Sequence, residues 1–151
     1  MHLPNMLEDL VAAERALADS FRAVSTGRPK DPDVHFLTMT FARECDEQVN
    51  ALLDVLRQFD GLIPADTEGI ALRGIEHARS GPLGLLRALQ ELHALADRVM
   101  TICQVVRQAA LALDDRPLVE TIDICREQTQ QQMEWLHTAL DKAAPQALIA
   151  G

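Results

Sequence analysis

The sequence predicts an all-α protein, a four-helix bundle, and three observations support this prediction. The composition is rich in Leu and Ala, 48% hydrophobic but only 3% aromatic, and it lacks Tyr. Long segments carry apolar residues at helical spacing, whereas the alternating Val-, Ile- and Thr-rich runs of strands are missing. Gly and Pro gather between these segments. With 151 residues the chain can bury a substantial core, so we expect residues 1–151 to form a single domain.

The first helix is expected to begin at Asn5, as a cap, with Glu8 three residues later as in a capping box. Its apolar residues follow helical spacing: Leu7, Leu10, Val11, Leu17, Phe21 and Val24. The stretch TGRPKDP ends this helix, and Asp31 with Pro32 opens the second as a cap and a first-turn proline. The second helix carries a similar series: Val34, Leu37, Phe41, Cys45, Val49, Leu52, Val55, Leu56 and Phe59.

Residues 60–82 are the least regular part of the chain, with four Gly and two Pro, and we expect a short helix around residues 67–79. A third helix is expected over about 83–113. After the turn DDRP, a fourth covers about 117–143 until Pro145 stops it. The apolar tail ALIAG is expected to pack on the bundle or on a second subunit.

The long connection bears on the topology of the bundle. The second helix spans on the order of 40 Å, and a segment of about 22 residues reaches farther than that. The connection is therefore long enough to run the length of the bundle and make the second and third helices parallel. We favour this single long crossover, because an up-down-up-down bundle has no use for so long a loop.

Charge and hydropathy disfavour several classes of partner. The net charge is −9, from 23 acidic and 14 basic residues, and no basic stripe is present, so we expect no nucleic acid and no membrane as partner. No apolar run approaches the ~20 residues that cross a bilayer, and the N-terminus lacks the pattern of an export signal. Three cysteines, Cys45, Cys103 and Cys125, lie among apolar residues, so we expect buried, reduced thiols and a cytoplasmic location.

Acidic residues on three of the expected helices are arranged as in a known superfamily. Glu14 is midway along the first helix, Glu44 lies in FARECDEQV on the second, and Glu134 and His137 form an E-x-x-H spacing on the fourth. With these residues the chain resembles the ferritin-like superfamily over essentially its whole length. The stretch GPLGLLRALQELHAL and the ending APQAL are similar to uncharacterised bacterial members. In members with a di-metal site, two helices each provide one Glu and two provide E-x-x-H.

The chain departs from that pattern on two helices. Residues 44–47 read ECDE, so Glu47 would have to replace the histidine as a ligand for Fe or Mn. The third helix offers Glu91, His93 and Asp97, with no clear choice among them.

Helical spacing also predicts which of these side chains point into the bundle. At about 100° per residue, Glu134 and His137 fall on the polar side of the fourth helix, and Glu47 falls on the outer side of the second. Glu14, by contrast, lies within about 30° of the apolar centre of the first helix. An isolated charge there would be very costly, so Glu14 must be paired, protonated or metal-bound.

The expected inward polar set is Glu14, Gln48, Thr129 and Gln132, with Glu44 at the margin. We predict that Glu14 is buried and hydrogen-bonded, with Gln48 as its partner. A dinuclear site normally takes four carboxylates and two imidazoles, which this set does not supply. A buried polar layer of this kind instead fixes the register of the helices.

Two functions follow from these patterns. The favoured one is a non-catalytic ferritin-like bundle without a cofactor, with the layer Glu14/Gln48/Gln132 where relatives hold metal, acting through binding or as a homodimer. The alternative is a di-metal protein with ferroxidase-like or O2/peroxide-activating oxidoreductase activity, in which the Fe or Mn ligands are Glu14, Glu44, Glu47, Glu134 and His137. The sequence leaves open whether the chain is an enzyme, and it identifies no ligand.

Overall fold

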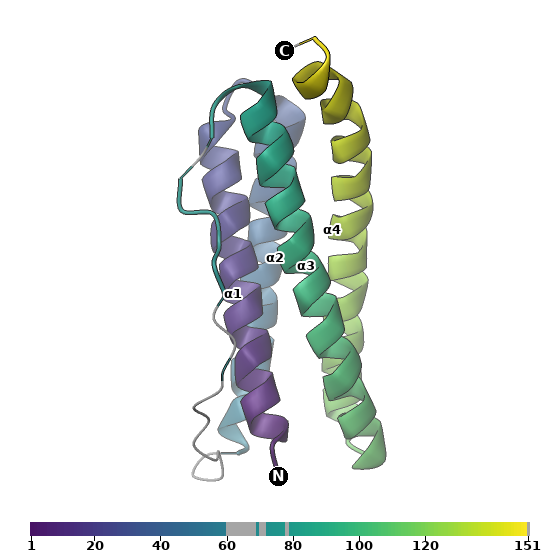
Figure 1. Ribbon diagram of the computed structural model, residues 1–151. Helices are drawn as coiled ribbons and strands as arrows, with labels where there is room; N and C mark the ends of the chain where they lie inside the picture. Colours follow the sequence, from purple (N-terminus) through teal and green to yellow (C-terminus); the bar gives the residue numbers. More distant parts are fainter. Residues whose placement is uncertain (60–68, 70–71, 78, 151) are drawn as a thin grey trace.

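The computed structural model describes residues 1–59, 69, 72–77 and 79–150. This part of the chain forms an all-α bundle of four helices (Figure 1). They are α1 (Leu3–Gly27), α2 (Pro32–Arg57), α3 (Gly81–Ala112) and α4 (Arg116–Leu148). Among the described residues, no helix has an apolar stretch long enough to cross a membrane. The all-α prediction and the four-helix prediction are confirmed.

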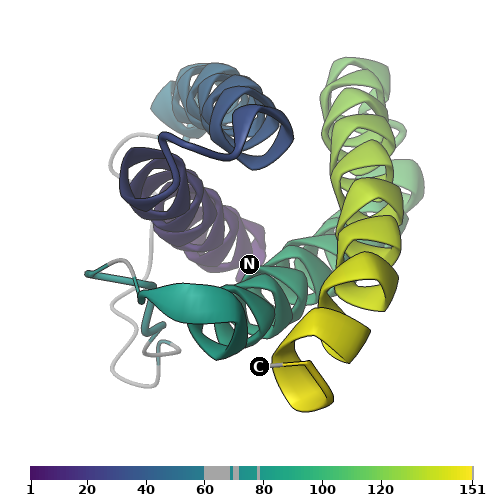
Figure 2. The ribbon, with the colours of Figure 1, turned by 90° about the horizontal axis from the view of Figure 1, so that it is seen from above.

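The helices α2 and α3 run in the same direction (Figure 1). The turn between α1 and α2 contacts the start of α3. The Arg28 guanidinium in this turn donates to the carbonyl oxygens of Arg79 and Gly81. The beginning of α3 is thus held at the end of the bundle where α2 also begins. Packing is most extensive between α1 and α2 and between α3 and α4, and it is weaker between α1 and α3 and weaker still between α2 and α4 (Figure 2). In the described part of the chain, the diagonal pairs α1–α4 and α2–α3 have no close backbone contact.

The described part of the connection between α2 and α3 lies against α1. The buried backbone N–H of Ile75 donates to Ser20 Oγ at 2.9 Å. Gly74 comes so close that an added Cβ would lie 2.8 Å from Ser20 Oγ and 3.3 Å from the carbonyl oxygen of Ala16. The short helix expected around residues 67–79 is not present at residues 72–77, which follow α1 in irregular conformation; residues 67–68, 70–71 and 78 lie outside the described part.

The helix ends confirm one predicted cap and correct two other predictions. Asp31 caps α2 by accepting a hydrogen bond from the backbone N–H of Val34. Asn5 does not cap α1, because that helix begins two residues earlier with Pro4 in its first turn, which places Asn5 inside the helix. Pro145 does not stop α4, which continues to Leu148. Its ring removes one backbone donor, but its carbonyl oxygen accepts from the N–H of Ile149.

The core consists mainly of Leu, Val and Ala side chains from all four helices. Its aromatic members form a chain, with ring centroids 5.4 Å apart for Phe21 and Phe41 and 5.6 Å apart for Phe41 and Trp135. Burying each large apolar side chain stabilises the fold by about 1.5–3 kcal/mol. The four helices therefore pack together around this apolar core, in which a few polar side chains are also buried.

Candidate functional site

Glu14 is buried at the centre of the bundle. Only 1% of its surface is exposed, and its Oε1 accepts a hydrogen bond from Cys125 Sγ at 3.0 Å. Burial raises the pKa of Glu14 from an ordinary value of 4.5 to about 7, although hydrogen bonds with Cys125 and Cys45 lower it. Glu14 therefore gains and loses its proton near neutral pH, which is unusual for a carboxylic acid.

The three cysteines line the same level of the bundle. All are buried, as predicted, and Cys103 Sγ donates to Cys125 Sγ at 3.4 Å, so that the two thiols form a short chain leading to Glu14. The hydrogen bond with Cys103 and burial raise the pKa of Cys125 well above its usual range. Burial and the charge of Glu14 do the same for Cys45. Cys45 and Cys125 are therefore neutral thiols, and they are the hydrogen-bonding partners of Glu14 that the sequence did not reveal.

Gln132 lies two turns beyond Cys125 on α4 and extends this group of polar contacts along the bundle. Its Nε2 donates to Glu44 Oε2 at 3.1 Å, and its Oε1 lies 3.9 Å from Cys45 Sγ. The sulfur of Cys45 thus lies between this amide and Glu14. We call the six side chains that meet here the polar layer: Glu14, Glu44, Cys45, Cys103, Cys125 and Gln132.

Gln48 and Thr129 are buried, as their helical positions predicted, but neither bonds to Glu14 in the described contacts. Gln48 Nε2 donates to Gln128 Oε1 at 2.9 Å, and the Thr129 hydroxyl donates to the carbonyl oxygen of Cys125. The predicted bond between Glu14 and Gln48 is therefore wrong. Helical periodicity correctly predicted that these side chains point into the bundle. It could not predict their hydrogen-bonding partners, which depend on the distances between the helices.

The five residues named as ligands for a di-metal centre are not brought together. Glu14 is buried and Glu44 is half-buried in the polar layer, whereas Glu47, Glu134 and His137 are exposed. A dinuclear carboxylate centre needs inward-pointing carboxylates and imidazoles from all of its helices. Two carboxylates with three thiols and an amide do not match that donor set. Among the described residues, no group of three or more His, Cys, Asp or Glu side chains is arranged to hold a metal ion.

The candidates on α3 have other neighbours. Glu91 Oε1 forms an ion pair with Arg79 at 2.7 Å. His93 Nε2 lies 3.1 Å from His137 Nε2, so these two predicted metal ligands meet on the surface and not in the interior. Asp97 is exposed.

A pocket of about 450 Å³ opens at the end of the bundle where α2 and α3 begin and α4 ends. Its apolar wall consists of seven side chains: Val34, Pro82, Leu85, Leu89, Trp135, Ala139 and Ala143. The charged residues Arg28, Asp31, Asp33 and Lys142 also line it. No pattern in the sequence predicted this pocket, because its wall combines side chains from three helices that spacing alone treats as ordinary core.

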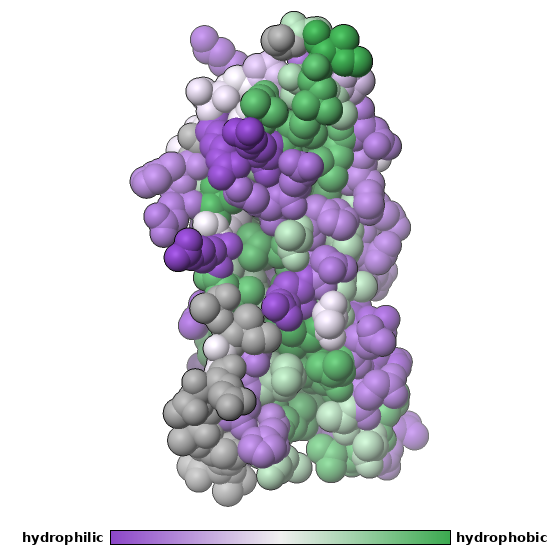
Figure 3. All heavy atoms as spheres, viewed as in Figure 1, coloured by the Kyte–Doolittle hydropathy of each residue, from purple (hydrophilic) through white to green (hydrophobic). Residues whose placement is uncertain are grey.

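The surface near the pocket is also apolar. Figure 3 shows hydrophobic residues around the C-terminal end of α4, where 67% of Leu148 and 85% of Ile149 are exposed. Trp135 is the single Trp of the chain, and its ring packs edge-on against Phe41 while part of it remains in the pocket wall.

No protein-family model, curated protein or solved structure significantly matches this chain. The geometry of the bundle and its residues is therefore the basis for assigning a function.

Proposed function

We propose that this protein is a ferritin-like bundle that acts by binding a small molecule and not by catalysis, with the end pocket as its binding site. The common direction of α2 and α3 supports the ferritin-like assignment, because bundles of that class have one long crossover. The polar layer supports a structural role for the interior. Its acid, Glu14, is hydrogen-bonded by the thiols of Cys125 and Cys45, which accounts for its burial without a bound group.

The observation that carries this proposal is the pocket itself. Its volume of about 450 Å³ falls within the range of about 300–1,000 Å³ that is typical of small-molecule sites. Its wall is mainly apolar and includes Trp135 and Leu89, and Lys142 also lines it. We expect the ligand to be a compact, largely apolar molecule, whose burial displaces water from the apolar wall.

Fluorescence of Trp135 tests this proposal directly, because no other Trp contributes to the signal. The probe is the dye 1-anilinonaphthalene-8-sulfonate, which is expected to bind once per chain and to quench Trp135. Ala139→Phe places a larger side chain in the pocket wall and should weaken binding at least tenfold. Ala144→Phe, half-buried on the same helix but outside the pocket lining, should bind as the unaltered protein does.

Equal binding of the dye by Ala139→Phe and Ala144→Phe would contradict the proposal. Circular dichroism and a cooperative unfolding transition must be retained in both, since loosely packed proteins also bind this dye. Unsaturable binding, or binding at many sites per chain, would also contradict a single pocket.

The alternative, an Fe or Mn carboxylate protein with oxidoreductase activity, has weaker support. Three of its five expected ligands, Glu47, Glu134 and His137, are exposed on the bundle. Metal analysis of protein produced with added iron and manganese distinguishes the two functions: about two metal ions per chain would favour the di-metal reading, and amounts near zero would favour the binding protein.

We also propose self-association as a homodimer and a cytoplasmic location. The pairs Cys103–Cys125 and Arg107–Asp123 place Val105 on α3 and Ile124 on α4 at about the same height along the bundle, and both are exposed apolar residues. Such residues favour burial against a second copy, and light scattering of the unaltered protein and of Ile124→Lys would measure the change in mass. The cytoplasmic location rests on three buried thiols, which remain reduced in that compartment.

A further inference from the structure

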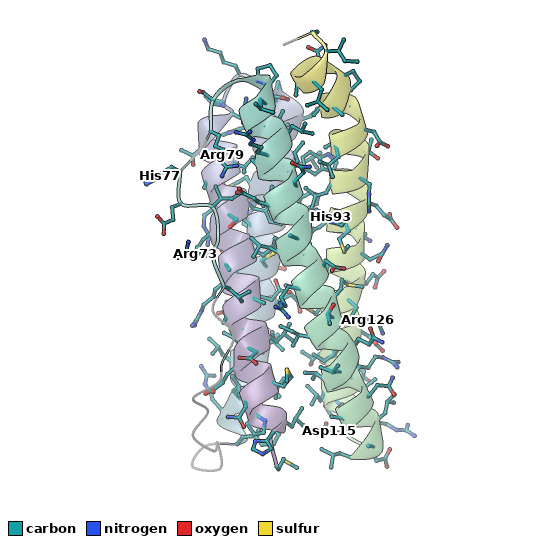
Figure 4. The ribbon with its side chains drawn as sticks, in the orientation of Figure 1. Arg73, His77, Arg79, His93, Asp115 and Arg126 are labelled. Atoms are coloured by element: carbon teal, nitrogen blue, oxygen red, sulfur yellow. The ribbon has the colours of Figure 1, made fainter. Side chains whose placement is uncertain are left out.

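Two histidines face each other across the surface of the α3–α4 pair. Nε2 of His93 on α3 and Nε2 of His137 on α4 are 3.1 Å apart, and the ring centroids are separated by 4.6 Å. Figure 4 shows His93 on α3, with α4 beside it. His137 follows Gln132, the nearest member of the polar layer on α4, by five residues, about 7.5 Å along the helix, and it is exposed whereas Gln132 is buried, so the pair is separate from the polar layer.

The distance between the two nitrogens suits a shared metal ion. Imidazole nitrogen binds Zn²⁺ at about 2.0–2.1 Å. Two nitrogens 3.1 Å apart would then subtend an angle of about 100° at the metal, between the right angle of square-planar sites and the tetrahedral angle. Both Nε2 atoms are on the facing sides of the two rings, so a rotation of each imidazole that turns its lone pair toward a common point brings both nitrogens onto one ion.

The positions of the histidines also favour a preformed site. Both lie well inside long helices, α3 (Gly81–Ala112) and α4 (Arg116–Leu148), which pack tightly along their length. His137 is exposed and His93 is half-buried, so water and ions reach the pair from the surface. Rigid helices hold the ligands at the required separation, which reduces the entropy lost on binding.

We propose that His93 and His137 form a surface clip for one divalent transition-metal ion, of the class Zn²⁺, Ni²⁺ or Cu²⁺. Imidazole is a preferred ligand for these ions, and water fills the remaining coordination positions. The E-x-x-H histidine of α4 thus binds metal outside the bundle and not within it. The clip joins α3 to α4, so that the bound ion stabilises the bundle. This inference is independent of the end pocket and does not depend on the function proposed for it.

Titration calorimetry with ZnCl2 and NiCl2 tests the clip on the full chain. One ion is expected per chain, and His93→Ala and His137→Ala should each weaken binding at least tenfold. His77→Ala is the matched control, because His77 is exposed on the connection and lies away from the pair (Figure 4). It should bind as the unaltered protein does.

Thermal unfolding provides a second test, because a hydrogen bond between the two imidazoles alone would not make Tm depend on Zn²⁺. Free Zn²⁺ at a hundredfold excess over Kd should raise Tm by about 5–10 °C in the unaltered protein. The same excess should leave Tm nearly unchanged in His137→Gln, which keeps a hydrogen-bonding side chain but loses the imidazole. Three results would overturn the clip: no binding at millimolar Zn²⁺, unchanged binding in both alanine variants, or equal loss in His77→Ala.

Discussion

The buried acid at the centre of the bundle makes the stability of this protein depend on pH. The pKa of Glu14 is about 7 in the folded protein, against 4.5 ordinarily. The folded protein therefore binds more protons than the unfolded chain between these values, so the free energy of unfolding falls as pH rises. The contribution of protonated Glu14 is complete below pH about 4.5 and is lost as pH rises through about 7.

The size of the effect follows from the separation of the two pKa values. At about 1.36 kcal/mol per pH unit, the interval from 4.5 to about 7 corresponds to a loss of about 3 kcal/mol between mildly acidic and mildly alkaline conditions. Glu14→Gln is close in shape and cannot ionise, so it lacks this loss. The difference in unfolding free energy, Glu14→Gln minus the unaltered protein, should therefore rise by about 3 kcal/mol between pH 4.5 and pH 8.

Urea unfolding followed by circular dichroism, at several pH values, measures this difference. Glu8→Gln is the control, since Glu8 lies on the same helix but is exposed, and its difference should stay nearly constant. Glu14→Leu should also keep the fold and unfold at a higher temperature at pH 8, because it removes the charge altogether. A flat or falling difference for Glu14→Gln would show that Glu14 does not titrate in the interior, and the reasoning on its burial would be wrong.

Two further predictions concern single contacts. Cys125→Ala removes a hydrogen bond that lowers the pKa of Glu14, so the loss of stability with rising pH should become larger in the same urea titration. Cys103→Ala is the control, because Cys103 has no described bond to Glu14. An equal change in both variants would contradict a direct bond between Cys125 and Glu14. Gly74→Ala should destabilise the protein by about 1–3 kcal/mol through overpacking, because its Cβ would lie 2.8 Å from Ser20 Oγ. The measurement is Tm, with Gly69→Ala as control because its nearest contact is 4.0 Å away; equal Tm values for the two variants would refute it.

Local chemistry accounts for the parts of the structure that were predicted correctly. Asp31 with Pro32 marks a helix start because a carboxylate cap and a first-turn proline both act within one turn. The prediction that Pro145 ends the fourth helix was wrong because the effect of a proline on a helix end also depends on the neighbouring turns. Here the carbonyl oxygen of Pro145 still accepts a hydrogen bond from the N–H of Ile149. The short helix expected around residues 67–79 failed at residues 72–77 because a contact with α1, through Ser20 and Ile75, decides their path.

The sequence alone determined four helices and the buried side of each, since a helix turns by a fixed angle and apolar residues must leave water. It thereby placed Glu14, Gln48, Thr129 and Gln132 inside the bundle. Only the tertiary structure decided which groups meet there and on the surface: a thiol beside Glu14, one histidine beside another, and an end pocket. The reason is that contacts between helices depend on their separation and relative height to within about 1 Å, and the periodicity of one helix carries no information on either.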